Sequence, residues 1–578
     1  MPFTNQYLID YFKQRMVELF DHNTLDSYRV RTCNTISILF ELKILIEGWL
    51  IGNVKRGETV GLCAEEAIMH LRNDEWIDYS FFDKEKFLDK IEAYQRNVSK
   101  IKDNKDKTER DIQDANCTLR LVSSFIEKND HIYLQKLVSA IEEDLFNATI
   151  YSDNDFVPVI ESLDIKLSKM ATELIRRGYS DRSLYFYFRS VKTNANGISF
   201  QDAFEQIKNK LCTVNPHKYT VIVRLESNKT IPHVDHLENE VPAQYIDQLG
   251  DAFKGFLKRH ERKRFFVTNV KAADMYSALN NARTQLSQIL DRNIMGNIQI
   301  SNQAIVTYKK GRSFINNSIS YYYDNDNNQS SSNQLTIIMK QIDDSTVISQ
   351  EIKDRLNTAL RHLRVGDSQT EIEQRFLNYW IGLEFIFATP KSGDSTYSRM
   401  VTMFPQIKTL YYLKRNIEDL DLRLKERGLL DNQSFASLSD NEIDDAFNQT
   451  QDILLKYRIK CMKSNLHHRD KIEKYLKRHI KNLTWHLSRI YYLRNELVHE
   501  AAIKQRMDSI TNNLRSYLVF MLNLLLDYCK QNYRRRNSNN VVVMDAFFWS
   551  NQILWEKCTP EYKKEEILSI SMPEKIVI

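Results

Sequence analysis

Residues 494–499 read RNELVH and place Arg494, Asn495 and His499 around two apolar side chains. Arginine presents a permanently charged, planar fork of N–H donors, and histidine exchanges a proton near neutral pH. Such a pair can bind an anion and transfer a proton at one site. The alternative interpretation is an ordinary surface pair, or side chains that complement the dipole at the end of a helix.

The helical pattern around this motif places the two ionisable residues on different faces. At the rotation typical of an α-helix, Asn495 and His499 lie about 40° apart, whereas Arg494 and His499 lie about 140° apart. Arg494 and His499 can therefore share a cleft only from its two edges, or by meeting across a symmetry axis between two copies of the chain.

The motif lies in a basic part of a nearly neutral chain. The 578-residue chain has a formal net charge of +5, but residues 451–540 hold 19 Lys and Arg residues against 7 Asp and Glu residues. This local excess favours a polyanionic partner, although a solvated helix surface also explains such a run.

Apolar periodicity divides the chain into four regions. Residues 1–215 carry mainly helical patterns, and residues 216–345 combine strand patterns with one amphipathic helix. Residues 346–535 return to helices, and residues 536–578 form a C-terminal tail. The predicted fold class is therefore α+β and predominantly α, with an N-terminal helical region, a small central α/β domain and a C-terminal helical bundle.

Shorter patterns predict the elements within these regions. In the central domain, strands are expected at residues 219–226, 263–270, 304–308, 318–323 and 335–339. A helix is expected at 272–290, and the polar segment 324–334 is expected to be a loop between two strands. In the C-terminal bundle, apolar residues three or four positions apart predict long helices at 471–499 and 508–530.

Several classes of protein are disfavoured by composition. The seven cysteines are far apart and form no CxxC pair, so neither a zinc ribbon nor a disulfide framework is indicated. His233, Asp235 and His236 could ligate a metal, but no further ligand cluster lies near them in sequence. The apolar stretches are interrupted by charge or are shorter than the about 20 residues of a membrane-spanning helix. The sequence thus indicates a soluble, cytoplasmic protein without a metal or another cofactor.

The RNELVH segment resembles the Arg-x4-6-His signature of HEPN domains, which favours a polar residue after the arginine. Residues 359–387 resemble the first helices of the Apea-like HEPN group, including its Trp-x-x-Leu-Glu pattern at Trp380, Leu383 and Glu384. Residues 173–185 are similar, more distantly, to a segment in the N-terminal regions of such proteins. The resemblance covers residues 346–535, which would then form an all-α HEPN bundle.

The resemblance implies a role for each residue of the motif. Arg494 and His499 from two protomers of a homodimer would converge on one cleft and cleave RNA without a metal ion. His499 would exchange a proton with the 2′-OH that attacks the phosphate, and Arg494 would stabilise the charge that accumulates there. Asn495 would orient His499 or hold a phosphate oxygen.

Two further candidates come from the residues themselves. Glu384 is flanked by apolar residues and could pair with Arg494, either to stabilise the bundle or to orient the arginine in support of the site. The basic cluster Arg534, Arg535 and Arg536 follows the last long helix and could contact RNA phosphates.

The resemblance also predicts a biological role, that of an endoribonuclease in bacterial defence against phage. RNA cleavage, with tRNA among the candidate substrates, would halt the growth of an infected cell (abortive infection). A phage-derived trigger or a restraining partner would control the activity. Two alternatives stay open, namely a non-catalytic HEPN protein that only binds or dimerises, and the toxin of a toxin–antitoxin pair.

Overall fold

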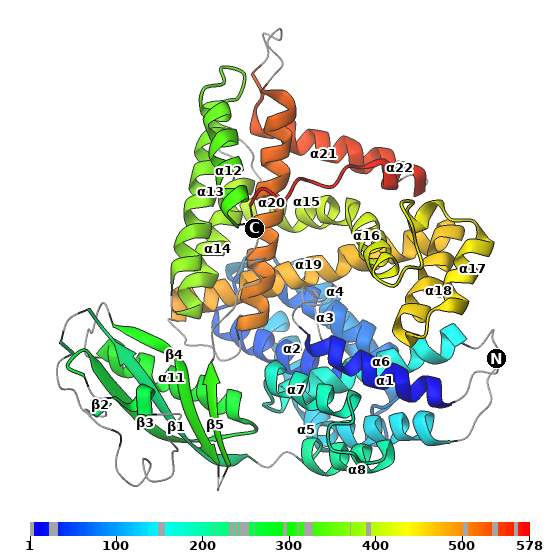
Figure 1. Cartoon of the computed structure of the whole chain (residues 1–578), viewed down its shortest axis with the longest axis vertical. Helices are drawn as coiled ribbons and strands as arrows, with labels where there is room; N and C mark the ends of the chain where they lie inside the picture. The colour runs from blue at the N-terminus through cyan, green and yellow to red at the C-terminus, as the bar shows by residue number, and fades with distance from the viewer. Residues whose placement is uncertain are drawn as a thin grey trace. The chain divides into compact units, whose positions relative to one another are not determined.

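The computed structural model of this chain has an α+β fold made mainly of helices, as the sequence predicts (Figure 1). Its long-range packing divides the chain into two compact units, one formed by residues 1–15, 23–169 and 323–578 and the other by residues 16–22 and 170–322. The structure describes residues 5–21, 33–147, 156–213, 216–228, 230–231, 237–238, 241, 254–258, 260–292, 298–308, 311–316, 328–369, 371–388, 395–500, 507–533, 541–559 and 564–577.

The first unit joins helices from both ends of the chain. From the N-terminal region it contains α2 (Thr35–Ile51), α3 (Gly57–Arg72), α4 (Lys84–Val98) and α5 (Glu109–Phe146). From the later part it contains α12 (Asn328–Asp343), α13 (Gln350–Ser368), α14 (Ile372–Phe387), α15 (Thr396–Leu410), α16 (Tyr412–Lys425), α17 (Asp440–Gln449), α18 (Ile453–His467), α19 (Arg469–Glu500), α20 (Asp508–Asn532), α21 (Met544–Cys558) and α22 (Lys564–Ser569). The helix that carries RNELVH therefore shares a compact unit with N-terminal helices.

Two helices form the centre of this unit, and both were expected from their apolar periodicity. In α19, Leu476, Leu483 and Leu487 are fully or almost fully buried, and α20 buries Leu518 and Leu525 in the same cluster. Apolar side chains at this spacing form one stripe, and burying that stripe supplies most of the stability of such helices. The predictions of helices at 471–499 and 508–530 are thus confirmed to within two residues at each end.

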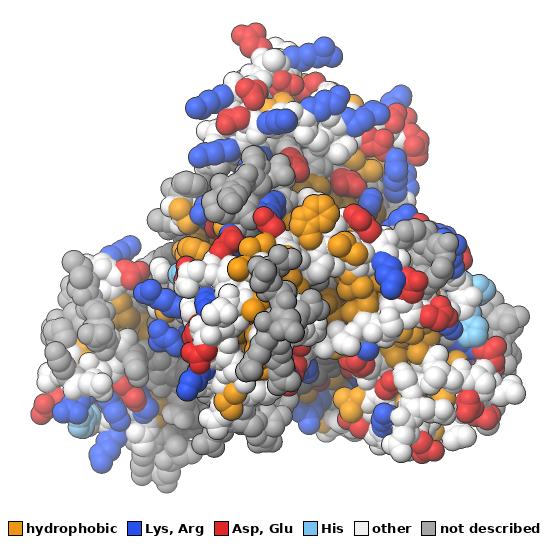
Figure 2. All heavy atoms as spheres, turned by 90° about the horizontal axis from the view of Figure 1, so that it is seen from above, with side chains coloured by type: hydrophobic (Ala, Val, Ile, Leu, Met, Phe, Trp, Pro, Cys, Tyr) orange, Lys and Arg blue, Asp and Glu red, His pale blue; other side chains and the backbone are white. Residues whose placement is uncertain are grey.

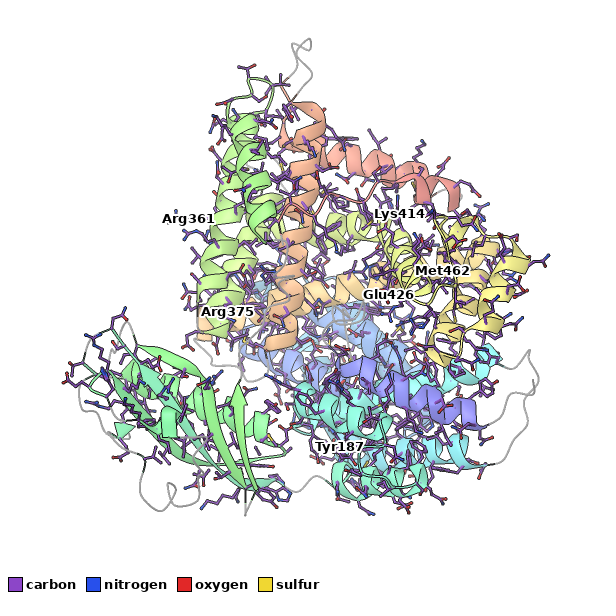
Figure 3. All side chains as sticks on the ribbon, viewed as in Figure 1. Tyr187, Arg361, Arg375, Lys414, Glu426 and Met462 are labelled. Atoms are coloured by element: carbon purple, nitrogen blue, oxygen red, sulfur yellow. The ribbon has the colours of Figure 1, made fainter. Side chains whose placement is uncertain are left out.

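The end of the chain packs on the same core. Met544, Phe547 and Phe548 of α21 belong to its buried cluster. Lys414 of α16, labelled in Figure 3, reaches the chain beyond α22, where its Nζ donates to the carbonyl oxygen of Ile570 at 2.7 Å. The last two helices are therefore part of the packed unit. Among the described helices, none combines the length and the apolar character that a lipid bilayer requires of a spanning segment.

The second unit contains an antiparallel sheet with strand order β2-β3-β1-β4-β5. The strands are β1 (His217–Glu226), β2 (Leu237–Glu238), β3 (Lys263–Ala272), β4 (Gln299–Tyr308) and β5 (Gly311–Asn316), and the helices α7 (Asp181–Lys192), α8 (Phe200–Leu211), α10 (Lys254–Leu257) and α11 (Met275–Arg292) accompany them. Helices α1 (Asn5–Phe20) and α6 (Phe156–Arg176) contribute residues to both units. Figure 1 shows α11 lying along one face of the sheet.

Alternation along β1 explains how this sheet is covered. Val221 and Val223 belong to the buried cluster that includes α11, whereas Ile222 belongs to a separate cluster on the opposite face, with Phe256 and Phe265. Side chains of a strand point alternately to its two faces, so both faces of β1 are buried. The strands predicted at 219–226, 263–270 and 304–308 and the helix predicted at 272–290 are confirmed.

Residues 335–339 were predicted to be a strand, and that prediction is wrong because they lie in α12. Helix α12 also begins at Asn328, within the segment 324–334 that was predicted to be a loop. Ile338 and Ile342 are buried four positions apart, so the apolar spacing here is helical. A short apolar run is ambiguous between the two structures, and packing on the first unit decided this one. The strand predicted at 318–323 lies outside the described residues.

Candidate functional site

The RNELVH motif lies at the C-terminal end of α19, beside a pocket of the first unit. The pocket has a volume of about 180 Å³ and is lined by Asn53, Val54, Lys55, Arg56, Thr59, Tyr491, Tyr492, Arg494 and Asn495. Two residues of the motif thus share a surface with the loop that joins α2 to α3. The sequence did not predict this loop as part of the site.

The loop is fixed in place at both of its ends. Helix α2 ends at Ile51, and its C-cap Gly52 has a left-handed backbone with φ of 93°, a conformation that glycine adopts without steric cost. Helix α3 begins at Gly57, where an added Cβ would lie 2.0 Å from the carbonyl oxygen of Val98. The Gly57 amide donates to the carbonyl oxygen of Ile101 at 3.1 Å. The backbone on either side of Lys55 and Arg56 is therefore constrained.

A stack of aromatic rings supports one wall of the pocket. The rings of Tyr397 and Tyr491 are stacked with their centroids 3.9 Å apart, and the guanidinium of Arg56 lies 5.5 Å from the centre of the Tyr397 ring. A cation at this distance from a tyrosine ring is attracted by its quadrupole. The indole of Trp380 lies 6.0 Å from the Tyr491 ring and is fully buried. The two rings of Tyr397 and Trp380 thus pack against Tyr491, which lies one turn before Asn495.

Within the motif, Arg494 contacts its neighbour. Its Nη1 donates a hydrogen bond to Oδ1 of Asn495 at 3.1 Å, and both side chains are half-buried. Tyr492 lies one turn before Glu496 of the motif, and its hydroxyl donates to Oε1 of Glu496 at 2.6 Å. Glu496 and Leu497 are buried, so the motif combines residues that face the core with residues that line the pocket.

The other predicted site residues have different placements. Glu384 accepts a hydrogen bond from Nε1 of Trp380 at 3.1 Å, which anchors it to its own helix α14, while Arg494 bonds to Asn495. The backbone of His499 belongs to α19, but its side chain lies outside the described residues. Arg534, Arg535 and Arg536 lie outside them as well, as do His233, Asp235 and His236.

The pocket is suited to an anion. Among the described residues, its lining includes the cations Lys55, Arg56 and Arg494 and no acidic side chain. Asn53, Thr59 and Asn495 add polar groups, and Arg56 is the N-cap of α3, where the helix dipole is positive. Arginine forks and lysine ammonium groups are the usual ligands of phosphate oxygens. The arrangement can therefore bind a phosphate group beside Arg494.

Side chains of both charge signs occur on the surface outside the pocket (Figure 2). On the face drawn in Figure 2, basic and acidic side chains of the described residues are intermingled, without a large region of one sign. The basic excess of residues 451–540 is partly neutralised in the same way, since Lys460 and Lys463 both pair with Asp444 at 3.0 Å. The positive charge counted along residues 451–540 is therefore partly offset by acidic residues elsewhere in the chain. The residues that line the pocket indicate an anion-binding site more directly than this count does.

Sequence reasoning missed Lys55 and Arg56 because they lie more than 400 positions before the motif. The available signal was the segment GNVKRGE (52–58), in which two adjacent cations stand between glycines that end one helix and begin the next. Comparison of the chain with protein-family models, with curated proteins and with solved structures finds no match.

Proposed function

We propose that this chain is a HEPN-type endoribonuclease that cleaves RNA without a metal ion, through Arg494, Asn495 and His499. The observation that carries the proposal is the pocket in which Arg494 and Asn495 lie beside Lys55 and Arg56. A second support is the position of RNELVH at the end of a long, packed helix. The resemblance of residues 346–535 to Apea-like HEPN domains supplies the reaction class.

The proposed chemistry needs only proton transfer and stabilisation of charge. The 2′-oxygen of one ribose forms a bond to the neighbouring phosphorus, and the bond from phosphorus to the 5′-oxygen breaks. His499 takes the proton of the 2′-OH or protonates the leaving oxygen, which is worth a factor of roughly 10²–10⁴ in rate. Arg494 binds the phosphoryl oxygens most tightly when charge has accumulated on them. The products are a 2′,3′-cyclic phosphate and a free 5′-OH.

We further propose that the protein acts in the bacterial cytoplasm as part of a defence against phage. In this role RNA cleavage, of tRNA or another cellular RNA, halts growth once a phage-derived trigger or the loss of a restraining partner has released the enzyme. The C-terminal helices would form a homodimer in which two protomers share a cleft. The proposal of a shared cleft rests on the helical geometry, since Arg494 and His499 project about 140° apart.

The test is to incubate the purified full chain with total cellular RNA, beside a His499→Ala control. Cleavage by the wild type alone, in EDTA and without added Mg²⁺, would support the proposal. Strict dependence on added Mg²⁺ would contradict it. Binding of RNA or of a protein partner without any cleavage would favour the non-catalytic HEPN alternative, and growth arrest without phage that a neighbouring gene suppresses would favour the toxin alternative.

A further inference from the structure

Three side chains with metal-binding chemistry meet in the first unit, at residues that the proposed ribonuclease reaction does not use. Cys33 precedes Asn34, the N-cap of α2, and Glu66 and His70 lie one turn apart on α3. Their ligand atoms all lie within 4.8 Å of one another. Glu66 is 1% exposed, and the other two side chains are partly buried. We propose that Cys33, Glu66 and His70 form a binding site for Zn²⁺.

The donor set fits this ion. Thiolate, imidazole and carboxylate are the three ligand types that zinc takes in proteins, and three protein ligands with water at a fourth position are common. Zinc bond lengths place tetrahedral ligand atoms roughly 3.3–3.7 Å apart. Nε2 of His70 lies 4.0 Å from Oε1 of Glu66, so small rotations of the side chains would close the site. A hard ion such as Mg²⁺ would not be preferred, because two of the donors are sulfur and nitrogen.

The local backbone already holds the first ligand in place. Cys33 is followed by Asn34, the N-cap of α2, whose side-chain oxygen accepts from the amide of Ser37 at 2.8 Å. The Asn34 side chain also donates to the carbonyl oxygen of Lys169 at 3.3 Å. Sγ of Cys33 lies 3.3 Å from the Ser37 hydroxyl, which accepts from the amide of Asn34 at 2.9 Å and donates to the Asn34 carbonyl oxygen at 2.9 Å. A ligand fixed by its neighbours loses little freedom when the ion binds.

An arginine from α19 orients the carboxylate. Nη2 of Arg489 lies 3.3 Å from Oε2 of Glu66, while the other oxygen, Oε1, faces His70. Nε of the same guanidinium lies 2.6 Å from Oε1 of Glu41. Ligating carboxylates in proteins are commonly held in this way by a partner on the second oxygen.

The charges around the cluster also favour a cation. Two carboxylates, Glu41 and Glu66, face one guanidinium, Arg489, and together they leave one negative charge in a largely buried place. A divalent ion bound to Cys33 as a thiolate adds one net positive charge and balances the group. Burying an unbalanced charge is costly, so the ion would stabilise this junction of α2, α3 and α19.

The experiment is cobalt substitution and zinc titration of the full chain. The wild type should bind one Zn²⁺ per chain, and its Co²⁺ form should show a near-ultraviolet thiolate-to-cobalt charge-transfer band. Cys33→Ser should lose that band, whereas the matched control Cys117→Ser, an exposed cysteine outside the cluster, should keep it. His70→Gln, with its fold checked by circular dichroism, should weaken zinc binding at least about 10-fold.

Three results would overturn the proposal, and none depends on ribonuclease activity. The first is wild-type protein that takes up no zinc. The second is a cobalt band that survives in Cys33→Ser, because the thiolate would then come from another cysteine. The third is folded His70→Gln that binds zinc as tightly as the wild type. If Cys33→Ser does not fold, the wild-type stoichiometry and the His70→Gln titration still decide the question.

Discussion

The guanidinium of Arg494 donates a hydrogen bond to the side-chain oxygen of Asn495 across 3.1 Å, and both side chains line the pocket that Lys55 and Arg56 share. A guanidinium has five N–H donors, so this bond restricts the orientation of the Arg494 side chain and leaves four donors that can bind a ligand. Asn495 thus helps to hold the Arg494 side chain in place. It also lies one helical turn before His499. Two of the three proposed site residues are therefore joined directly by a hydrogen bond.

Arg494→Ala and His499→Ala should each lower RNA turnover by about two to four orders of magnitude, because one removes charge stabilisation and the other removes proton transfer. The double variant should lose little more than either single variant, since residues that act together in one step are not additive. Single-turnover cleavage of a defined RNA measures all three, and circular dichroism checks the fold. Full activity of His499→Ala would remove the motif from the reaction.

Mixing the two inactive variants tests whether the site is shared. If each cleft takes Arg494 from one protomer and His499 from the other, a heterodimer of Arg494→Ala and His499→Ala chains regains one intact cleft and part of the activity. If each cleft needs both residues from both protomers, mixing restores nothing. Light scattering reports the oligomeric state at the same concentration, and a fully active monomer would contradict the shared site.

The loop between α2 and α3 should contribute phosphate contacts. In a His499→Ala background, which leaves the RNA intact, Lys55→Ala and Arg56→Ala should each weaken binding and reduce the slope of log K against log salt by about 0.7–0.9. Lys86→Ala is a matched control, because Lys86 is a lysine of the same unit whose side chain is 85% exposed and lies outside the pocket. Equal slopes for the Lys55 and Lys86 variants would show that the pocket does not bind the RNA backbone.

Two ion pairs join α19 to α3, and they should differ in their contribution to stability. Arg489 pairs with Glu66, whose side chain is 1% exposed. Lys481 pairs with Glu65 at 3.0 Å, and the Lys481 side chain is 61% exposed. Burial alone lowers the pKa of Arg489, but the carboxylates of Glu41 and Glu66 more than offset this and raise the pKa.

In protein freed of zinc by a chelator, Arg489→Met should therefore lower the free energy of unfolding by about 3 kcal/mol, because it leaves Glu66 buried without the cation that faces it. Lys481→Met should lower it by less than about 1 kcal/mol, since an exposed pair is screened by solvent. Urea unfolding of the two variants beside the wild type makes the comparison. Equal losses would show that burial does not set the strength of these contacts.

His479 of α19 should make the protein less stable in mild acid. Its ring stacks on Tyr412 with centroids 3.6 Å apart and an interplanar angle of 6°. Burial lowers the pKa of His479 well below its usual value, and the cations Arg415 and Lys408 lower it further. Below about pH 6.5 the unfolded chain then binds a proton that the folded chain does not bind.

The free energy of unfolding should consequently fall as the pH falls below about 6.5, by up to about 1.4 kcal/mol per pH unit from this group. His479→Phe keeps an aromatic ring in the stack but cannot titrate, so its unfolding free energy should depend less on pH. His468→Gln removes an exposed histidine and serves as the control. Urea unfolding between about pH 7.5 and about pH 5.5 measures the slopes. Identical slopes in the wild type and His479→Phe would rule out the contribution.

Elements with a clear apolar period were predictable from the amino-acid sequence alone. The stripe of α19, including Leu476, Leu483 and Leu487, and the alternation of Val221, Ile222 and Val223 in β1 both depend on local spacing, which the chain displays directly. The same spacing was too short to decide α12, where burial of Ile338 and Ile342 against distant helices selected a helix over a strand. The motif RNELVH was recognisable for the same reason, because its residues are contiguous.

The distant residues that accompany the motif become visible only when the helices are packed in three dimensions. Lys55 and Arg56 line the pocket with Arg494, and Cys33 meets Glu66 and His70, although no local pattern links these positions. Helix α19 packs beside α3, and the ion pair of Arg489 with Glu66 joins the two helices. Such contacts follow from the fit of whole helical surfaces, and a single sequence does not display that fit.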